Sequence, residues 1–161
     1  MSSATGPGAA VWAAALRLLA RAPRSTAELE EALAARGFAT DVVAAALARL
    51  CELRYLDDED LALRRAEDLL LRRGCGRLRV AHELTRRGVA DTVIEKAIAA
   101  ALEGRSEREL AREALGRKLG GRPLVSPAAR QRAFRFLTSR GHPPETVEEI
   151  LETESSSSSS S

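Results

Sequence analysis

Arginine side chains are the residues of this sequence best suited to chemistry, and that chemistry is the recognition of anions. Residues 64–88 carry eight arginines against only three acids, and residues 108–140 carry nine basic residues against Glu109 and Glu113. A guanidinium group presents a planar fork of donors that matches carboxylate and phosphate oxygens. The two blocks therefore predict a basic strip for a polyanion or an acidic protein groove.

The candidate partner-binding residues are all arginines of these two blocks: Arg72, Arg73, Arg77, Arg79, Arg86, Arg87, Arg130, Arg132 and Arg135. The chain has only five aromatic residues, which leaves little to stack on bases and favours contact with phosphates or acidic side chains. The alternative is a merely solvated surface, because cations are also favoured at helix C-termini, where Arg72-Arg73 and Arg86-Arg87 are expected.

No arrangement of residues predicts catalysis, a cofactor or a metal. No nucleophile stands beside a base in a known motif, and His82 and His142 have no cysteine or acidic spacing around them. The run Asp57-Asp58-Glu59-Asp60 lacks the alternating spacing of a calcium loop, so we interpret it as a helix start. We expect a non-enzyme whose Cys51 and Cys75 are free thiols, with no membrane span, because the longest apolar run is too short.

The elements that must position these arginines are predicted to be helices. Hydrophobic residues make up 45% of the chain but aromatic residues only 3%, so alanine, leucine, valine and isoleucine must form the core. Two capping boxes, Ser25 with Glu28 and Ser106 with Glu109, predict helix N-termini. Asp91 is expected to cap a third helix.

Three stretches of the chain repeat one pattern when they are aligned on Gly37, Gly88 and Gly141. An arginine precedes each glycine, a leucine lies four residues before it, and Leu47, Ile98 or Leu151 lies ten residues after it. Such self-similarity is typical of a repeat array. We predict an all-α fold of three tandem three-helix repeats in an elongated, curved array. The expected units are a disordered N-terminus at 1–10, repeats at 11–56, 57–104 and 105–153, and a disordered serine tail at 154–161.

Residues 25–56 taken alone would also fit a winged-helix DNA-binding module. A wing requires a β-hairpin next, whereas a strongly helical run follows Asp57. We therefore favour the helical array and keep a helix-turn-helix-like DNA-binding transcriptional regulator as the alternative hypothesis.

Three segments resemble the RecX regulatory family. They are Tyr55-Leu56-Asp57-Asp58 with Ala62, the stretch from Gly76 to Val89 (GRLRVAHELTRRGV), and Phe136-Leu137-Thr138-Ser139-Arg140-Gly141. The resemblance runs from about Leu16 to Leu151. Leu61 and His142 depart from the aromatic residues usual in the family, and we interpret both as packing positions.

The resemblance implies a cytoplasmic, non-enzymatic protein of three three-helix repeats that binds the RecA recombinase. Such proteins lodge in the groove of the RecA filament on DNA and restrain its strand exchange, ATP hydrolysis and coprotease activity, which modulates recombination and the SOS response. We expect a monomer, with single- or double-stranded DNA backbone as a second possible contact.

Overall fold

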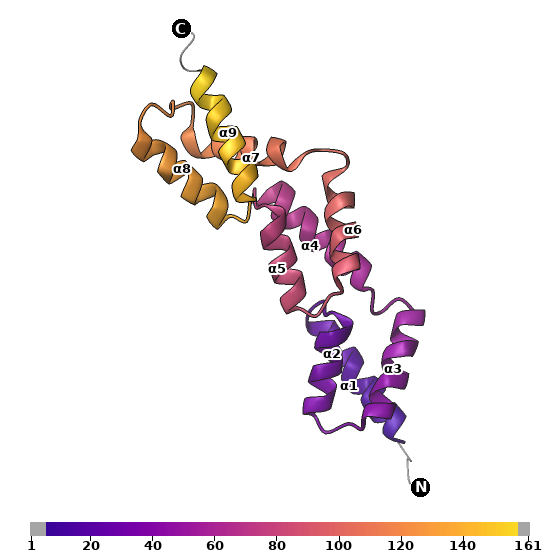
Figure 1. Ribbon diagram of the computed structural model, residues 1–161. Helices are drawn as coiled ribbons and strands as arrows, with labels where there is room; N and C mark the ends of the chain where they lie inside the picture. The colour runs from indigo at the N-terminus through magenta and orange to yellow at the C-terminus, as the bar shows by residue number, and fades with distance from the viewer. Residues whose placement is uncertain (1–5, 158–161) are drawn as a thin grey trace.

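A computed structural model describes residues 6–157, and every regular element in that range is helical. Figure 1 shows an elongated row of three units. Repeat 1 contains α1 (Pro7–Arg21), α2 (Thr26–Ala35) and α3 (Thr40–Glu52). Repeat 2 contains α4 (Asp58–Glu67), the short π-helix η1 (Asp68–Arg72), α5 (Arg77–Arg86) and α6 (Asp91–Leu102). Repeat 3 contains α7 (Glu107–Leu119), α8 (Pro127–Ser139) and α9 (Pro144–Ser157).

The outermost helices extend further than the sequence pattern predicts. Helix α1 begins at Pro7 instead of Val11, because proline is well suited to the first helical position. Helix α9 continues to Ser157, and the Ser155 hydroxyl donates to the Leu151 carbonyl at 2.8 Å. The predicted disorder of residues 1–5 and 158–161 lies outside the described residues. Within the described range, no helix has the length and apolar character needed to span a membrane.

Each repeat has its own hydrophobic core. The leucines that precede the three aligned glycines, Leu33, Leu84 and Leu137, are fully buried, one in each of three separate clusters. Leu110 of α7 is the exception, because it packs into the cluster of repeat 2. The chain is thus three small cores joined in a row, as repeat architectures are.

The helix starts follow local capping chemistry in most cases. Both predicted capping boxes form, with the Glu28 N–H donating to Ser25 Oγ at 3.1 Å and the Glu109 N–H to Ser106 Oγ at 3.2 Å. In the acidic run, Asp57 Oδ1 accepts from the Asp60 N–H at 3.0 Å, which confirms its role at a helix start. The prediction for Asp91 was wrong: Ala90 is the N-cap of α6, and no side chain caps this end.

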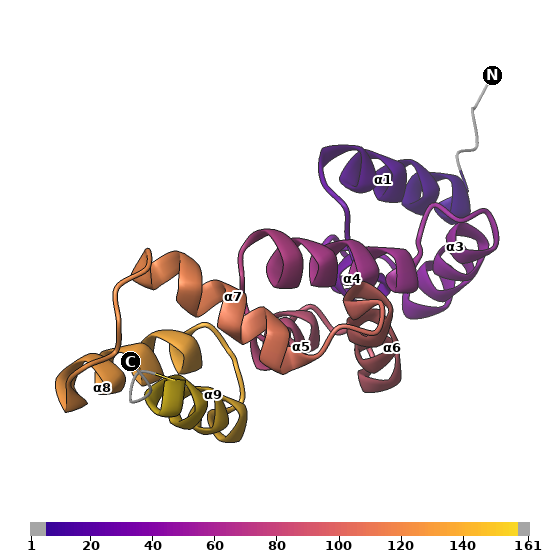
Figure 2. The same cartoon turned by 90° about the horizontal axis from the view of Figure 1, so that it is seen from above.

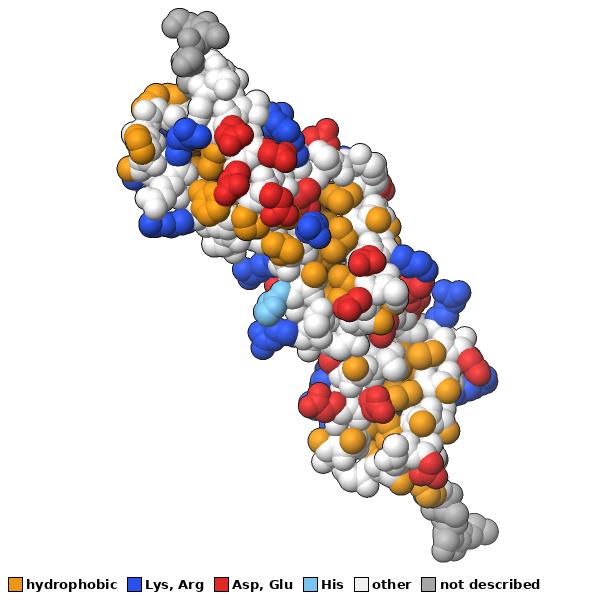
Figure 3. All heavy atoms as spheres, in the orientation of Figure 1, with side chains coloured by type: hydrophobic (Ala, Val, Ile, Leu, Met, Phe, Trp, Pro, Cys, Tyr) orange, Lys and Arg blue, Asp and Glu red, His pale blue; other side chains and the backbone are white. Residues whose placement is uncertain are grey.

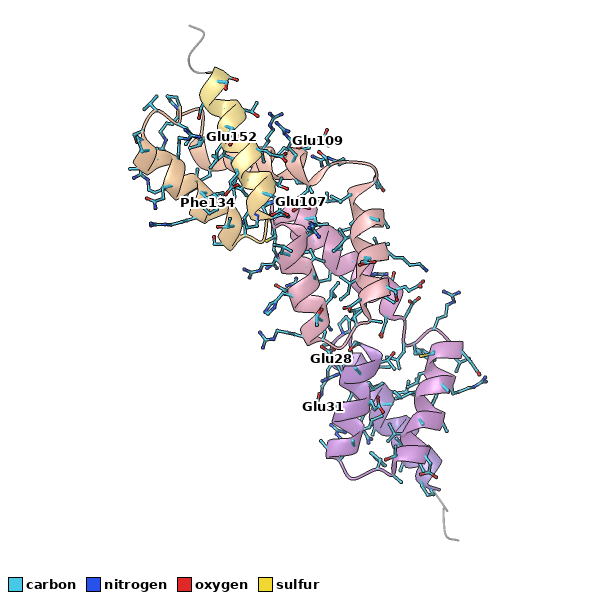
Figure 4. All side chains as sticks on the ribbon, in the orientation of Figure 1. Glu28, Glu31, Glu107, Glu109, Phe134 and Glu152 are labelled. Carbon is cyan, nitrogen blue, oxygen red and sulfur yellow. The ribbon has the colours of Figure 1, made fainter. Side chains whose placement is uncertain are left out.

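The second helices of the repeats, α2, α5 and α8, follow one another end to end, as Figure 1 shows, and Figure 2 shows the same row of units from above. At the junction of repeats 1 and 2, the Ser25 hydroxyl at the start of α2 donates to the Arg87 carbonyl at the end of α5. The Arg87 guanidinium donates to both oxygens of Glu28 at 2.7 and 3.0 Å. Figure 4 shows Glu28 at the end of α2 that faces α5.

The junction of repeats 2 and 3 follows the same plan with different atoms. The Gly76 N–H donates to the Arg140 carbonyl at 2.9 Å, and the Leu78 N–H to the Gly141 carbonyl at 3.0 Å. The Arg-Gly turn of each later repeat thus docks on the start of the preceding second helix. This arrangement also places the negative end of one helix dipole against the positive end of the next.

A polar pair of repeat 3, formed by His142 and Glu107, also contacts repeat 2. His142 is fully buried, with Nε2 3.1 Å from the Gly74 carbonyl and Nδ1 3.2 Å from Glu107 Oε1. Because a carbonyl can only accept, Nε2 carries a hydrogen. Glu107 Oε1 also accepts from the Arg77 N–H at 3.0 Å, and Figure 4 shows Glu107 where α9 meets repeat 2.

Candidate interaction surface

Three of the predicted arginines belong to a face made jointly by α5 and α8. Arg79 and Arg86 share one side of α5 with His82 and line a cleft with Thr138 and Ser139 of α8. Arg135 lies on the same side of α8, since it precedes these two residues by about one turn. Arg79 is paired with Glu83 at 3.4 Å, whereas Arg86 and Arg135 form no ion pair with a described residue. This surface, formed by Arg79, His82, Arg86 and Arg135, is called the α5–α8 face below.

Arg72 and Arg73 lie elsewhere, in a groove between repeats 2 and 3. The π-helix η1 ends at Arg72, and the groove of about 330 Å³ continues onto α7 and the end of α8. Asp68 neutralises part of this charge, at 3.0 Å from Arg73 and 4.0 Å from Arg72. The groove, called the junction groove below, is lined by five cations: Arg72, Arg73, Arg117, Lys118 and Arg140.

The sequence prediction missed three of those five cations. Arg117 and Lys118 belong to the second basic block but were not selected, because nothing in their spacing relates them to Arg72 and Arg73. Neither forms an ion pair with a described residue. Arg140 donates to the Arg73 carbonyl, and its place in the Arg-Gly alignment was the signal that could have identified it.

Two of the predicted arginines, Arg87 and Arg130, form hydrogen bonds with other parts of the chain. Burial raises the pKa of Glu28, but hydrogen bonds from Arg87 and from the Ser25 N–H outweigh this and leave its pKa below the ordinary 4.5. The hydrogen bond to Glu28 in turn raises the pKa of Arg87. Arg130 donates to the Leu151 carbonyl of α9 at 3.4 Å. Both side chains therefore stabilise the array in this structure.

The remaining two arginines lie at the margins of these surfaces. Arg77 is exposed at the start of α5, and Arg132 is exposed on α8 beside a hollow between α7 and α8. The nine predicted arginines thus do not form one strip. They are divided between the α5–α8 face, the junction groove and contacts inside the chain.

The charge is distributed unevenly around the molecule. Figure 3 shows acidic side chains over α9 and hydrophobic ones over α3 and α6 on the face toward the viewer, with Lys and Arg mostly along the edges. Within residues 6–157, no group of three or more potential ligands is placed to hold a metal ion. What the described surfaces offer is cationic recognition by several guanidinium groups.

Comparisons with known proteins agree with this architecture. The family model of the RecX first three-helix domain matches residues 12–50, and that of the RecX second three-helix domain matches residues 57–98. Regulatory protein RecX from Chlorobaculum tepidum is 36% identical over 137 residues, which cover 85% of this chain and 83% of the relative. Regulatory protein RecX from Mycolicibacterium smegmatis is 36% identical over 143 residues, 86% of this chain and 76% of the relative.

Solved structures share the fold. The crystal structure of RecX from Lactobacillus salivarius superposes with a TM-score of 0.76 at 16% identity and covers 92% of this chain and 97% of that one. A second crystal structure of regulatory protein RecX gives a TM-score of 0.73 at 20% identity, over 91% of this chain and 73% of that one. With both family models matched in order and relatives aligned over most of their length, the chain belongs to the RecX family of regulatory proteins.

Proposed function

We propose that this protein is a non-enzymatic cytoplasmic regulator that binds the RecA filament on DNA. In this role it restrains ATP hydrolysis, strand exchange and coprotease activity, and so modulates recombination and the SOS response. The observation that carries the proposal is family membership combined with a row of helical repeats whose second and third units hold most of the basic residues. An extended row of repeats offers a long surface for a groove.

The α5–α8 face is the part that we assign to the filament. Arg86 and Arg135 are exposed and form no ion pair with a described residue, so their charge is available to an acidic protein surface or a phosphate. Repeat 1 is nearly neutral, with five acids against six arginines in residues 11–56, and it has no basic block like those of residues 64–88 and 108–140. It therefore contributes less to the binding of a polyanion.

The alternative, a helix-turn-helix-like DNA-binding regulator, gains no support from the surface of α3. A recognition helix contributes basic or polar side chains to the major groove. Arg49 is the one basic residue of α3, and its guanidinium group forms an ion pair with Glu52 at 3.0 Å.

The test measures RecA ATP hydrolysis on single-stranded DNA while the protein is titrated in. The wild-type chain should inhibit at stoichiometric levels. The double variant Arg86→Glu/Arg135→Glu should need about tenfold more protein for the same inhibition, because each change replaces attraction with repulsion. Arg36→Glu is the matched control, since Arg36 is also exposed but lies in repeat 1.

Three results would reject parts of this proposal. Full RecA turnover at a large excess of the wild-type protein would reject RecA as the partner. Tight, sequence-dependent binding to naked duplex DNA in the absence of RecA would favour the transcriptional regulator. Retained inhibition by the double variant, with its helical circular dichroism intact, would show that the α5–α8 face is only a solvated surface.

A further inference from the structure

Repeat 3 contains a mostly apolar hollow between its first and second helices. The hollow has a volume of about 300 Å³ and lies between α7 and α8. Its apolar lining comes from α7, from Pro123 and from α8: Leu115, Leu119, Pro123, Ala129, Ala133 and Phe136. This volume is at the small end of the range for ligand pockets, so the hollow suits one large side chain.

Small residues in α8 open this hollow. Counted from the aligned glycines, Ala133 occupies the position held by Leu29 in repeat 1 and Val80 in repeat 2, both of which are fully buried core residues. Replacement of leucine or valine by alanine removes side-chain volume between the first and second helices. Helix α8 also starts three residues earlier relative to its glycine than α2 does, which adds Ala129 to the wall.

The hollow continues directly into the junction groove. Lys118 and Phe136 line both, so an apolar anchor point and a cluster of cations form one continuous surface. Arg122 and Arg132 add charge at the rim of the hollow. Of the cations in the groove, Arg117 and Lys118 have no carboxylate partner among the described residues.

We propose that this combined surface binds an acidic peptide segment that carries a large apolar residue. The apolar side chain fills the hollow between α7 and α8, and neighbouring Asp or Glu side chains contact Lys118, Arg117 and Arg73 in the junction groove. Buried apolar anchors in pockets dominate binding energy at protein interfaces, and clusters of arginine recognise acidic motifs. The proposal does not depend on regulation of RecA, because the surface is separate from the α5–α8 face.

Two observations favour a peptide over a nucleic acid. Most of the hollow is aliphatic, which suits a side chain better than a phosphate. Phe136 is the aromatic residue on which a base would stack, but its ring is already covered by Lys118 Nζ at 5.3 Å and by the Arg140 guanidinium carbon at 5.1 Å from the centroid.

The experiment is a fluorescence anisotropy titration of the full chain with a labelled peptide in which one leucine is flanked by two aspartates on each side. We expect saturable binding that weakens about tenfold when serine replaces the leucine, because burial of the leucine side chain is lost. Ala133→Leu should weaken binding to a similar extent, because it restores the residue of repeat 1 and fills the hollow. Lys118→Glu should weaken binding and reduce its dependence on salt. Arg36→Glu should leave it unchanged.

Several outcomes would overturn the proposal. Absence of saturable binding would do so, as would equal binding by wild type and a folded Ala133→Leu variant. If Ala133→Leu fails to fold, Ala129→Leu at the partly exposed wall replaces it. Displacement of the peptide by single-stranded oligodeoxythymidine at equal concentration would assign the groove to nucleic acid instead.

Self-association must be measured in parallel. Tyr55 is 59% exposed and precedes the acidic run that starts at Asp57, so the same chain carries a segment of the proposed chemistry. Sedimentation velocity should show a monomer that is unaffected by Tyr55→Ser. Association that Tyr55→Ser abolishes would assign the surface to a second copy of the chain and overturn a separate peptide partner.

Discussion

Arg36, Arg87 and Arg140 occupy one position of the repeat but have three different environments. Arg36 is exposed in the first repeat. Arg87 forms a two-pronged ion pair with Glu28 of the preceding repeat, and Arg140 lies over the Phe136 ring and donates to the Arg73 carbonyl. The repeated sequence pattern therefore fixes arginine at this position, whereas the surroundings in each repeat determine which groups the side chain contacts.

At the residue scale, we predict that Arg87→Ala lowers the free energy of unfolding by about 1–2 kcal/mol at neutral pH, because it leaves the half-buried Glu28 carboxylate without its partner. Arg36→Ala should change it by less than about 0.5 kcal/mol. Since the pKa of folded Glu28 lies below the ordinary 4.5, its contribution is present above that pH and is lost as the pH falls below it. Urea unfolding of wild type and Arg87→Ala at neutral and acidic pH tests this prediction. A difference in the free energy of unfolding that stays the same at both pH values would contradict it.

At the scale of elements, the aligned glycines carry different constraints. Gly37, Gly88 and Gly141 all have positive φ, of 86°, 77° and 90°. A Cβ at Gly37 would meet nothing within 4 Å, whereas one at Gly141 would lie 2.5 Å from the backbone nitrogen of Arg79. The end of α8 thus approaches the start of α5 so closely that only glycine fits between them.

We therefore expect Gly141→Ala to be clearly more destabilising than Gly37→Ala. Gly37→Ala should lower the free energy of unfolding only by the strain of a left-handed backbone, about 1–2 kcal/mol. The Gly141 variant bears the same strain and must also separate repeat 3 from repeat 2. Thermal unfolding of the two variants under one set of conditions measures the difference, and equal losses of Tm would show that the close approach is unimportant.

The elements could be predicted from the sequence because their signals are local. The capping boxes at Ser25 and Ser106 each span four residues, and the Arg-Gly turns mark the ends of the second helices. The junctions could not be predicted, since Ser25 and Arg87 are 62 positions apart and meet only after two repeats dock. For the same reason the predicted basic strip was incomplete, because Lys118 joins Arg73 only in the folded chain.

At the scale of the whole molecule, stability is distributed over three cores instead of one. Direct polar contacts between repeats are concentrated at the ends of the second helices. Leu110 supplies the apolar link between repeats 2 and 3. In such arrays, stability is approximately the sum of unit and interface contributions, so damage to one unit spreads mainly to its neighbour.

This arrangement predicts a local response to core mutations. Leu33→Ala and Leu137→Ala remove equivalent, fully buried side chains and should each cost about 2–5 kcal/mol. Hydrogen exchange should accelerate most in repeat 1 for the first variant and in repeat 3 for the second, with the distant repeat least affected. Uniform acceleration across all three repeats in both variants would instead indicate a single cooperative unit.

The Arg-Gly junction has a direction, because the surface that docks and the surface that receives it are different. Repeat 2 offers the end of its second helix to repeat 1 and the start of that helix to repeat 3. Repetition of such a heterologous contact generates a ring where the rotation closes and an open screw where it does not, and the elongated row in Figure 1 is the open case. Binding residues carried at equivalent positions therefore succeed one another along the row, so the chain can contact a helical partner at successive points where the spacing of the partner's sites matches that of the repeats.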